Sequence, residues 1–164
     1  MAANDTGVPS SVVVAVRARP LSQKEIQNKH DSCASLTSTS VTLADPTEPT
    51  KKRSFAFDHA YDTQADQLTV YNDIGKPLLD KAFDGWNGTI FAYGQTGAGK
   101  SFSMTGTPTA PGIVPQMNAD MFSRIAALKD AEPNKKFLVT CAFLEIYNEV
   151  LFDLLDPSGR AGAS

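Results

Sequence analysis

Apolar residues of this sequence are concentrated in a few short, continuous runs. Val12–Val16 is rich in β-branched residues, which predicts a strand buried on both faces, as in a parallel sheet covered by helices. Thr89–Tyr93 and Phe137–Ile146 have the same character and predict two further central strands. Val150–Leu155 is another short apolar segment. These runs indicate a sheet whose strands come from distant parts of the chain.

Two longer stretches have the three- and four-residue spacing of amphipathic helices. The first is predicted to begin at the capping pattern Thr63-Gln64-Ala65-Asp66 and to end near Asp84, with a kink at Pro77. The second is predicted after an interruption at Gly106–Gly112, with Pro115 in its first turn. The positions expected to be buried are Leu68, Tyr71, Ile74, Leu78 and Ala82 in the first helix, and Val114, Met117, Met121, Ile125 and Leu128 in the second.

Weak alternation of apolar and polar residues adds two short strands. Ser40–Leu43 and Arg53–Phe57 show it, with an exposed loop between them. The overall order of strand, helix, strand, helix and strand predicts an α/β fold. Residues 12–157 are expected to form this domain. The small and polar residues of 1–11 and 158–164 predict flexible ends.

Length and charge limit the number of domains and the kind of partner. The chain has 164 residues, which suits one domain, and a formal net charge of -3, which disfavours a nucleic acid as the main partner. No run of about 18 apolar residues is present, so no membrane span is predicted. Cys33 and Cys141 are interpreted as reduced thiols of an intracellular protein.

The strongest chemical signal lies directly after the predicted strand Thr89–Tyr93. It matches the pattern G-x-x-x-x-G-K-S/T, in which glycines let successive backbone N–H groups point at phosphate oxygens. Lys100 is expected to neutralise the β- and γ-phosphates of a nucleotide, and the Ser101 hydroxyl to ligate Mg²⁺. The alternative, a glycine-rich turn with an incidental lysine, leaves the strand before the pattern and the helix after it unexplained. The predicted phosphate-binding residues are Gly94, Gln95, Thr96, Gly97, Ala98, Gly99, Lys100 and Ser101.

The sequence around this loop resembles the kinesin motor domain. The likeness runs from Gly88 to Ser101 and includes Arg17-Ala18-Arg19-Pro20 at the end of the first predicted strand. Tyr71–Trp86, with its internal proline, is similar to the first long helix of that family. In total the likeness covers about Val12 to Pro157. The further blocks that match in order are Met104-Thr105-Gly106, Gly112-Ile113-Val114-Pro115 and Glu145-Ile146-Tyr147-Asn148-Glu149 to Leu155.

The resemblance implies an α/β domain of the P-loop NTPase type, with a sheet flanked by helices. Such a domain binds ATP or ADP with Mg²⁺ and couples ATP hydrolysis to movement along microtubules, which implies a cytoplasmic protein on the cytoskeleton. The resemblance also assigns the adenine contacts: Arg17, Arg19 and Pro20 would border the base, with Phe102 packing on its other face. Without the resemblance, the two arginines would be interpreted as solvated charges at a strand end.

Two nucleotide-sensing patterns of that family are absent from these residues. Neither an Asn-x-x-Ser-Ser-Arg-Ser-His nor an Asp-Leu-Ala-Gly pattern occurs. No complete catalytic set is therefore predicted, although Lys100 contributes to one, and turnover by this chain alone is expected to be slow. The central strands would also lack neighbours, which leaves open a piece of a longer protein, completion by a second chain, or strands that pair differently. The alternative functions are a nucleotide-binding or interaction module without turnover and an unrelated small P-loop NTPase.

Overall fold

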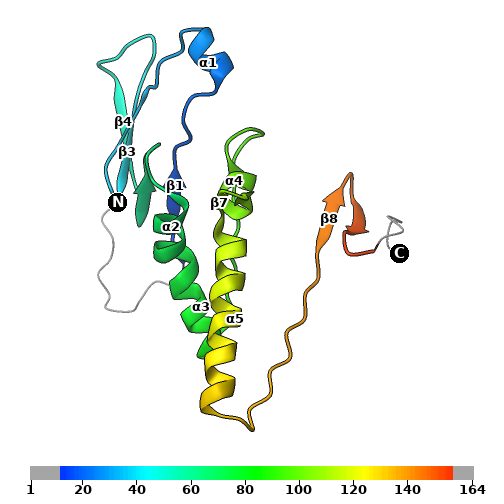
Figure 1. The fold of residues 1–164 in the computed structure, drawn as a ribbon. Coiled ribbons are helices and arrows are strands. Elements are labelled where there is room, and N and C mark those ends of the chain that lie inside the picture. The colour runs from blue at the N-terminus through cyan, green and yellow to red at the C-terminus, as the bar shows by residue number, and fades with distance from the viewer. Residues whose placement is uncertain (1–11, 157–164) are drawn as a thin grey trace. The chain divides into compact units, whose positions relative to one another are not determined.

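The computed structural model describes residues 12–156. The flexible ends predicted at 1–11 and 158–164 lie outside the described residues. The chain divides after Phe122 into two compact units, which are considered in turn. Helices and strands are mixed along the chain (Figure 1), which confirms the α/β class predicted from the sequence.

The first unit contains a parallel strand pair and an antiparallel sheet. β1 (Ala15–Arg17) pairs in parallel with β5 (His59–Tyr61). β2 (Ala34–Leu36), β3 (Ser40–Ala44) and β4 (Lys52–Ala56) form the antiparallel sheet, in the order β2-β3-β4. β3 and β4 confirm the two strands that weak alternation predicts in this region.

The first predicted helix is present, but it is wound in three parts. α2 (Gln67–Val70) and α3 (Lys76–Phe83) flank the π-helical segment η1 (Tyr71–Gly75). The segment closes with a hydrogen bond from the Lys76 N–H to the Tyr71 carbonyl. Pro77 follows in the first turn of α3, where a missing N–H removes no α-helical hydrogen bond. At the place where a kink at Pro77 is predicted, the structure has a change from α-helical to π-helical winding before the proline.

A single acidic side chain caps the start of α2. The Asp66 carboxylate accepts a hydrogen bond from the Thr69 N–H at 2.7 Å. Hydrogen bonds with the Thr69 side chain and backbone lower the pKa of Asp66. The capping residue is therefore Asp66 and not Thr63, and the helix begins three residues later than the predicted capping box implies.

The buried face of this helix differs in part from the predicted one. Tyr71 is buried and Ile74 and Leu78 are half-buried, as predicted, but Leu68 and Ala82 are exposed. The π-helical segment holds more residues per turn than an α-helix. Positions chosen at three- and four-residue steps therefore do not stay on one face of the helix across this segment. The residues that are buried in the three parts are Gln67, Val70, Tyr71, Gly75 and Leu79.

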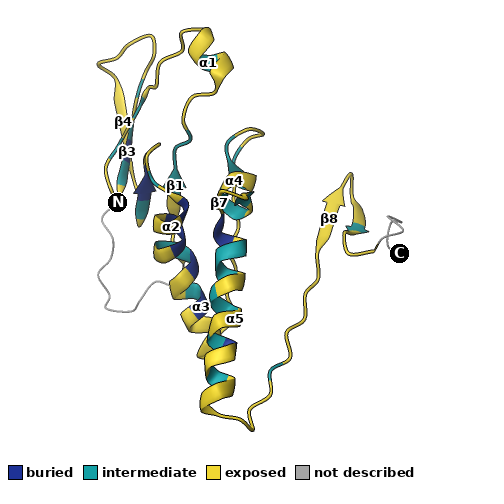
Figure 2. Ribbon diagram, viewed as in Figure 1, coloured by how far each residue is buried: buried dark blue, intermediate teal, exposed yellow. Residues whose placement is uncertain are grey.

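The core of the first unit gathers around two tyrosines, and Figure 2 shows the buried positions on α2 and α3 in dark blue. The Tyr71 hydroxyl donates a hydrogen bond to the Asp120 carboxylate at 2.7 Å. The Tyr61 hydroxyl donates to the Asp73 carboxylate at 3.0 Å, and burial together with this hydrogen bond raises the pKa of Tyr61. Both buried hydroxyls are therefore satisfied. The cluster consists of Tyr61, Val70, Tyr71 and Ile113.

A short helix and a tight hairpin separate this core from the second predicted helix. α4 (Lys100–Met104) leads into β6 (Gly106–Thr107) and β7 (Ala110–Pro111), which pair antiparallel. The hairpin is the interruption predicted at Gly106–Gly112. Gly106 is required there, because it has a φ of 74° and a Cβ on it would lie 2.2 Å from the Ala110 carbonyl oxygen.

The second predicted helix is α5 (Ile113–Ala131), with Pro115 in its first turn as predicted. The predicted apolar stripe is wrong at its first position, because Val114 is exposed and Ile113 is buried in its place. The remaining predicted positions are buried or half-buried, as expected, namely Met117, Met121, Ile125 and Leu128.

Two apolar runs of the first unit do not form the strands predicted for them. β1 begins only at Ala15, and the three valines before it, Val12 to Val14, are exposed. Residues 89–93 are not part of any strand, and Phe91 and Tyr93 are 82% and 94% exposed. Within residues 12–156 no strand pairs with residues 89–93, and a strand without neighbours cannot satisfy its N–H and C=O groups.

The second unit consists of the C-terminal part of α5, an extended stretch and a hairpin of β8 (Leu144–Tyr147) and β9 (Val150–Asp153). The predicted central strand Phe137–Ile146 is wrong for residues 137–143, where Leu138 is 90% exposed and no partner strand lies within the described range. The short apolar segment predicted at Val150–Leu155 corresponds to β9. None of the helices in residues 12–156 is both long and apolar enough to cross a membrane.

Candidate functional site

The predicted phosphate loop joins residues 89–93 to α4 through backbone that only glycine adopts easily. Gly94, Gly97 and Gly99 have φ values of 154°, 81° and 97°. Gly99 is the N-cap of α4, so the loop opens directly onto the start of that helix. Free backbone N–H groups at a helix start and positive-φ glycines are the elements from which anion-binding loops are built.

Lys100 is folded back across this loop. Its Nζ donates hydrogen bonds to the carbonyl oxygens of Gly94, at 2.8 Å, and Gln95, at 2.9 Å. The two carbonyls hold the ammonium group close to the loop backbone instead of leaving it in solvent. Ser101 occupies the next helical position and is exposed. The structure thus brings the Lys100 ammonium group and the Ser101 hydroxyl to the same end of α4.

The residues predicted to contact adenine line one pocket of about 230 Å³ beside this loop. Arg17, Arg19 and Pro20 come from the end of β1, and Phe102 comes from α4. The end of the phosphate loop, through Ala98 and Gly99, lines the same pocket. The other lining residues are Ala18, Asp62, Thr63, Ala65, Asp66, Gln67, Ser103 and Ala110. All four predicted residues are therefore together and adjacent to the phosphate loop.

A larger hollow of about 410 Å³ lies in the second unit and contains none of the residues predicted to bind the nucleotide. It is formed by the β8–β9 hairpin and the residues that follow β9, among them Glu145, Tyr147 and Asp156. This hollow lies on a two-stranded hairpin, and the charged side chains that line it are all acidic, which does not suit the phosphates of a nucleotide. We therefore assign the site to the smaller pocket. No group of His, Cys, Asp and Glu side chains that could hold a metal ion is found within residues 12–156.

Arg17 is fixed against Phe102 and forms part of the same wall. Its guanidinium carbon lies 5.2 Å from the centroid of the Phe102 ring. The guanidinium donates hydrogen bonds to Gln67 Oε1 at 2.7 Å, to Ser103 Oγ at 3.2 Å and to the Ala65 carbonyl at 3.0 Å. Partial burial lowers the pKa of Arg17. Sequence reasoning places Arg17 and Phe102 on opposite faces of the base, whereas here they pack on each other.

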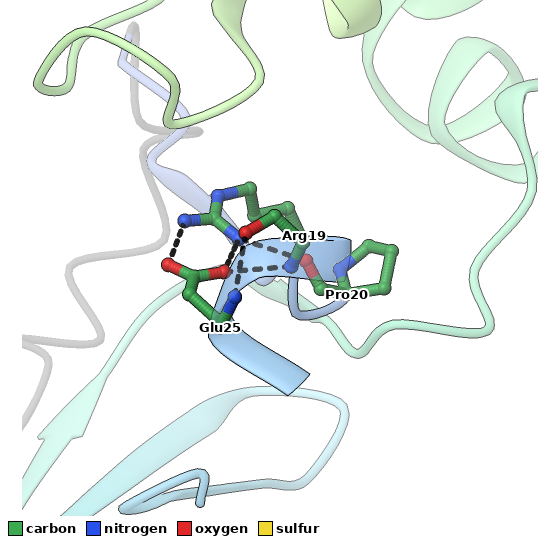
Figure 3. A network of polar contacts seen from close by, with 4 residues as sticks. Arg19, Pro20 and Glu25 are labelled. Carbon is green, nitrogen blue, oxygen red and sulfur yellow. Dashed lines mark hydrogen bonds and ion pairs between the residues drawn. The ribbon is translucent and has the colours of Figure 1, made fainter. Parts of the chain in front are cut away.

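Arg19 is held by a carboxylate from α1 (Gln23–Gln27), as Figure 3 shows. The two terminal nitrogens of its guanidinium donate to the two oxygens of Glu25, each at 2.7 Å, and one of them also donates to the Pro20 carbonyl at 2.9 Å. The hydrogen bonds from Arg19 hold the pKa of Glu25 well below its usual range, and the same contact raises the pKa of Arg19. This bidentate pair fixes the plane of the guanidinium.

Glu25 also completes a capping box at the start of α1. Its side chain accepts a hydrogen bond from the Ser22 N–H at 2.6 Å, and the Ser22 hydroxyl accepts one from the Glu25 N–H at 3.3 Å. Glu25 and the Gln67 amide are residues of the site that sequence reasoning missed. The spacing Ser22-x-x-Glu25 is the signal that could have revealed Glu25. No local pattern marks Gln67.

The pair of Arg19 and Glu25 predicts a pH-dependent contribution to stability. Because the pKa of Glu25 is lowered on folding from the ordinary value of 4.5, the contribution is present above that pH and is lost as the pH falls below it. Glu25→Gln should therefore lower the melting temperature near neutral pH, and the difference from wild type should narrow as the pH falls below 4.5. Thermal unfolding followed by circular dichroism at about pH 7 and about pH 3 measures this.

Glu48→Gln is the matched control, because Glu48 forms an exposed, single-contact pair with Lys51 at 2.7 Å. Exposed pairs of this kind contribute little, so the control should melt close to wild type at both pH values. A Glu25→Gln protein that differs from wild type equally at both pH values would show that its lowered pKa is not the cause.

Comparison with known proteins identifies the family. The family model for the kinesin motor domain matches residues 17–163. The rat kinesin-like protein KIF1A is 38% identical over 162 residues, and the human kinesin-like protein KIF1C is 40% identical over 162 residues. Each alignment covers 92% of this chain, but only 9% of KIF1A and 14% of KIF1C.

Solved structures show the same likeness in three dimensions. A KIF14 dimer in its two-heads-bound state, with AMP-PNP and in complex with a microtubule, matches with a TM-score of 0.80 and 36% identity. KIF14 with ADP in complex with a microtubule matches with a TM-score of 0.74, also at 36% identity. The matches cover 94% of this chain and 43% and 44% of those chains. They confirm the P-loop NTPase type of fold that the resemblance implies, and this chain belongs to the kinesin motor domain family.

Proposed function

We propose that this chain binds ATP and ADP, with Mg²⁺, as the nucleotide-binding part of a microtubule motor in the cytoplasm. The observation that carries the proposal is the single pocket that Arg17, Arg19, Pro20 and Phe102 share with the end of the phosphate loop. The pocket offers planar and apolar groups, and it borders the glycine backbone of the loop that carries Lys100. A nucleotide presents the same pairing, with a flat base at one end and phosphates at the other.

The phosphates would be held by the loop from Gly94 to Ser101. The Lys100 ammonium bonds only to neutral carbonyls, so negatively charged phosphate oxygens would replace these partners with a gain in charge-assisted hydrogen bonding. The positive-φ glycines leave the backbone free of side chains on the approach of the anion. The Ser101 hydroxyl would hold Mg²⁺, which neutralises phosphate charge when it is bound.

The base would lie in a slot that both arginines line. Arg17 packs with Phe102, and these two residues are called the base wall; Arg19 and Pro20 line the same pocket. Both guanidinium groups are fixed by hydrogen bonds, so little side-chain freedom remains to be lost when a base stacks on them. Fixed planar cations and an aromatic ring suit adenine.

The motor part of the proposal rests on the family. The KIF14 structures that this chain resembles carry AMP-PNP or ADP and are in complex with a microtubule. The chain spans less than half of those chains and about a tenth of the curated relatives, so hydrolysis and movement belong to a complete motor domain. In that domain, the nucleotide held here would set whether the filament is bound tightly or released, with Lys100 as the one group of this chain aimed at the γ-phosphate.

Substitutions in the base slot should weaken nucleotide binding without removing its dependence on magnesium. Arg19→Ala or Phe102→Ala removes one stacking surface, which is expected to cost about 1–2 kcal/mol of binding free energy. Calorimetric titration of the chain with ATP, in the presence of Mg²⁺ and of a chelator, measures both properties. Arg53→Ala and Phe55→Ala are matched controls on the exposed strand β4 and should bind as wild type. Unchanged affinity in both slot variants would reject the adenine assignment.

A further inference from the structure

Gln67 is a buried polar side chain of the pocket that the phosphate and base contacts do not explain. It is the first residue of α2, it is only 7% exposed, and it lines the pocket. We propose that Gln67 is a positioning residue of the nucleotide site, which sets the base wall by holding Arg17 flat against Phe102. This inference rests on the proposed nucleotide binding.

One end of the Gln67 amide holds Arg17. Oε1 accepts a hydrogen bond from the Arg17 guanidinium at 2.7 Å, which is shorter than the bond from the same nitrogen to Ser103 Oγ, at 3.2 Å. The Ala65 carbonyl accepts from the other terminal nitrogen at 3.0 Å. Two of the three acceptors come from the start of α2 and the residue before its cap, and the guanidinium carbon lies 5.2 Å from the centroid of the Phe102 ring. Gln67 therefore supplies the shortest of the hydrogen bonds that orient the cation.

The other end of the amide holds the helix that follows the phosphate loop. Nε2 donates hydrogen bonds to the Phe102 carbonyl at 2.7 Å and to the Ala110 carbonyl at 3.1 Å. The helix α4 has five residues, so its last carbonyls have no partner within the helix and need one from outside. The Gln67 amide supplies this partner for the Phe102 carbonyl. The side chain that orients Arg17 thus also fixes the residue against which Arg17 packs.

The partners leave the amide only one orientation. A guanidinium only donates hydrogen bonds and the two carbonyls only accept them, so the oxygen faces Arg17 and the nitrogen faces Phe102 and Ala110. A half-turn of the amide would place donor against donor and acceptor against acceptor. The geometry of the base wall therefore depends on the chemical asymmetry of this side chain and not only on its volume.

The substitution Gln67→Met tests this role, because it keeps the length of the side chain and removes all three hydrogen bonds. The measured quantity is the contribution of the nucleoside to binding: the ratio of the Kd of Mg²⁺-tripolyphosphate to the Kd of Mg²⁺-ATP. Gln67→Met should reduce this ratio about tenfold, as expected for the loss of a hydrogen bond to a charged group. The Kd of tripolyphosphate should stay within about twofold of wild type, because Lys100 and the loop are untouched.

The control is Gln116→Met, the same chemical change in a neighbouring side chain. Gln116 Nε2 donates to the Gln67 backbone carbonyl at 3.1 Å and to the Pro111 carbonyl at 2.8 Å, but Gln116 is not among the residues that line the pocket. This variant should keep the wild-type ratio. Equal losses in Gln67→Met and Gln116→Met would indicate general loosening of the fold and would overturn the proposal.

A double substitution shows whether Gln67 acts through Arg17. In an Arg17→Met background, Gln67→Met should lower the ratio no further, because the group that Gln67 orients is gone. Additive losses would overturn the positioning role, as would an unchanged ratio in Gln67→Met alone. If circular dichroism shows that Arg17→Met does not fold, the comparison of Gln67→Met with Gln116→Met still tests the positioning role of Gln67. A folded wild-type chain that bound neither ligand would instead reject the proposed function.

Discussion

Replacing Lys100 by alanine is expected to abolish nucleotide binding by this chain. The Lys100 ammonium lies against the carbonyls of Gly94 and Gln95, on the loop where phosphates would be held. Of the residues that line the adjacent pocket or form the loop, Lys100 is the only lysine, and both arginines are already engaged by protein acceptors. Several negative charges on ATP would then face glycine backbone without a cationic side chain of the loop.

Fluorescence anisotropy of a fluorescent ATP analogue measures this loss. Lys129→Ala is the matched control, because Lys129 is an exposed residue near the end of α5 and is remote in sequence from the loop. The control should bind as wild type, whereas Lys100→Ala should show no saturable binding. Equal binding by wild type and Lys100→Ala would reject the assignment of the phosphate loop.

Turnover is the second property for which a large effect is expected. This chain, tested alone, should release phosphate from ATP at no more than roughly a few per cent of the rate of a complete motor domain, without strong stimulation by microtubules. The loop can hold a nucleotide, but equal stabilisation of ground state and transition state does not accelerate a reaction. Acceleration needs groups aimed at the attacking water and at the charge that develops on the γ-phosphate. Lys100 and Ser101 supply only part of that set.

Steady-state phosphate release at saturating Mg²⁺-ATP, across a microtubule titration, tests this expectation. A complete kinesin motor domain in the same assay provides the reference rate. Strong, microtubule-activated release by this chain that disappears in Lys100→Ala would contradict the prediction. It would mean that residues of this chain outside the phosphate loop take part in sensing the nucleotide.

Features determined by neighbouring residues could be predicted from the sequence. The turn of the phosphate loop follows from its glycines, the interruption before α5 from Gly106, and the start of α2, to within three residues, from a capping pattern. Each of these depends on backbone freedom or on hydrogen bonds within a few residues. The clustering of Arg19 and Phe102 was also anticipated, but through the family resemblance and not from local physics.

Features that depend on distant partners could not be predicted in this way. The apolar runs Val12–Val16, Thr89–Tyr93 and Phe137–Ile146 have the composition of central strands, yet most of these residues pair with nothing in the described part of the chain. Composition reports how a strand would be buried, whereas pairing depends on whether neighbours are present. Gln67 was missed for a related reason, because its partners come from three segments that only the fold brings together.

The central claim is that this chain supplies the nucleotide site of a microtubule motor. It is tested most directly by joining the chain to the C-terminal half of a kinesin motor domain and measuring phosphate release with and without microtubules. The joined protein is predicted to hydrolyse ATP with clear microtubule stimulation, and Lys100→Ala is predicted to remove that activity. Stimulated release that persists unchanged in Lys100→Ala, or a folded joined protein that binds ATP but shows no stimulation, would contradict the claim.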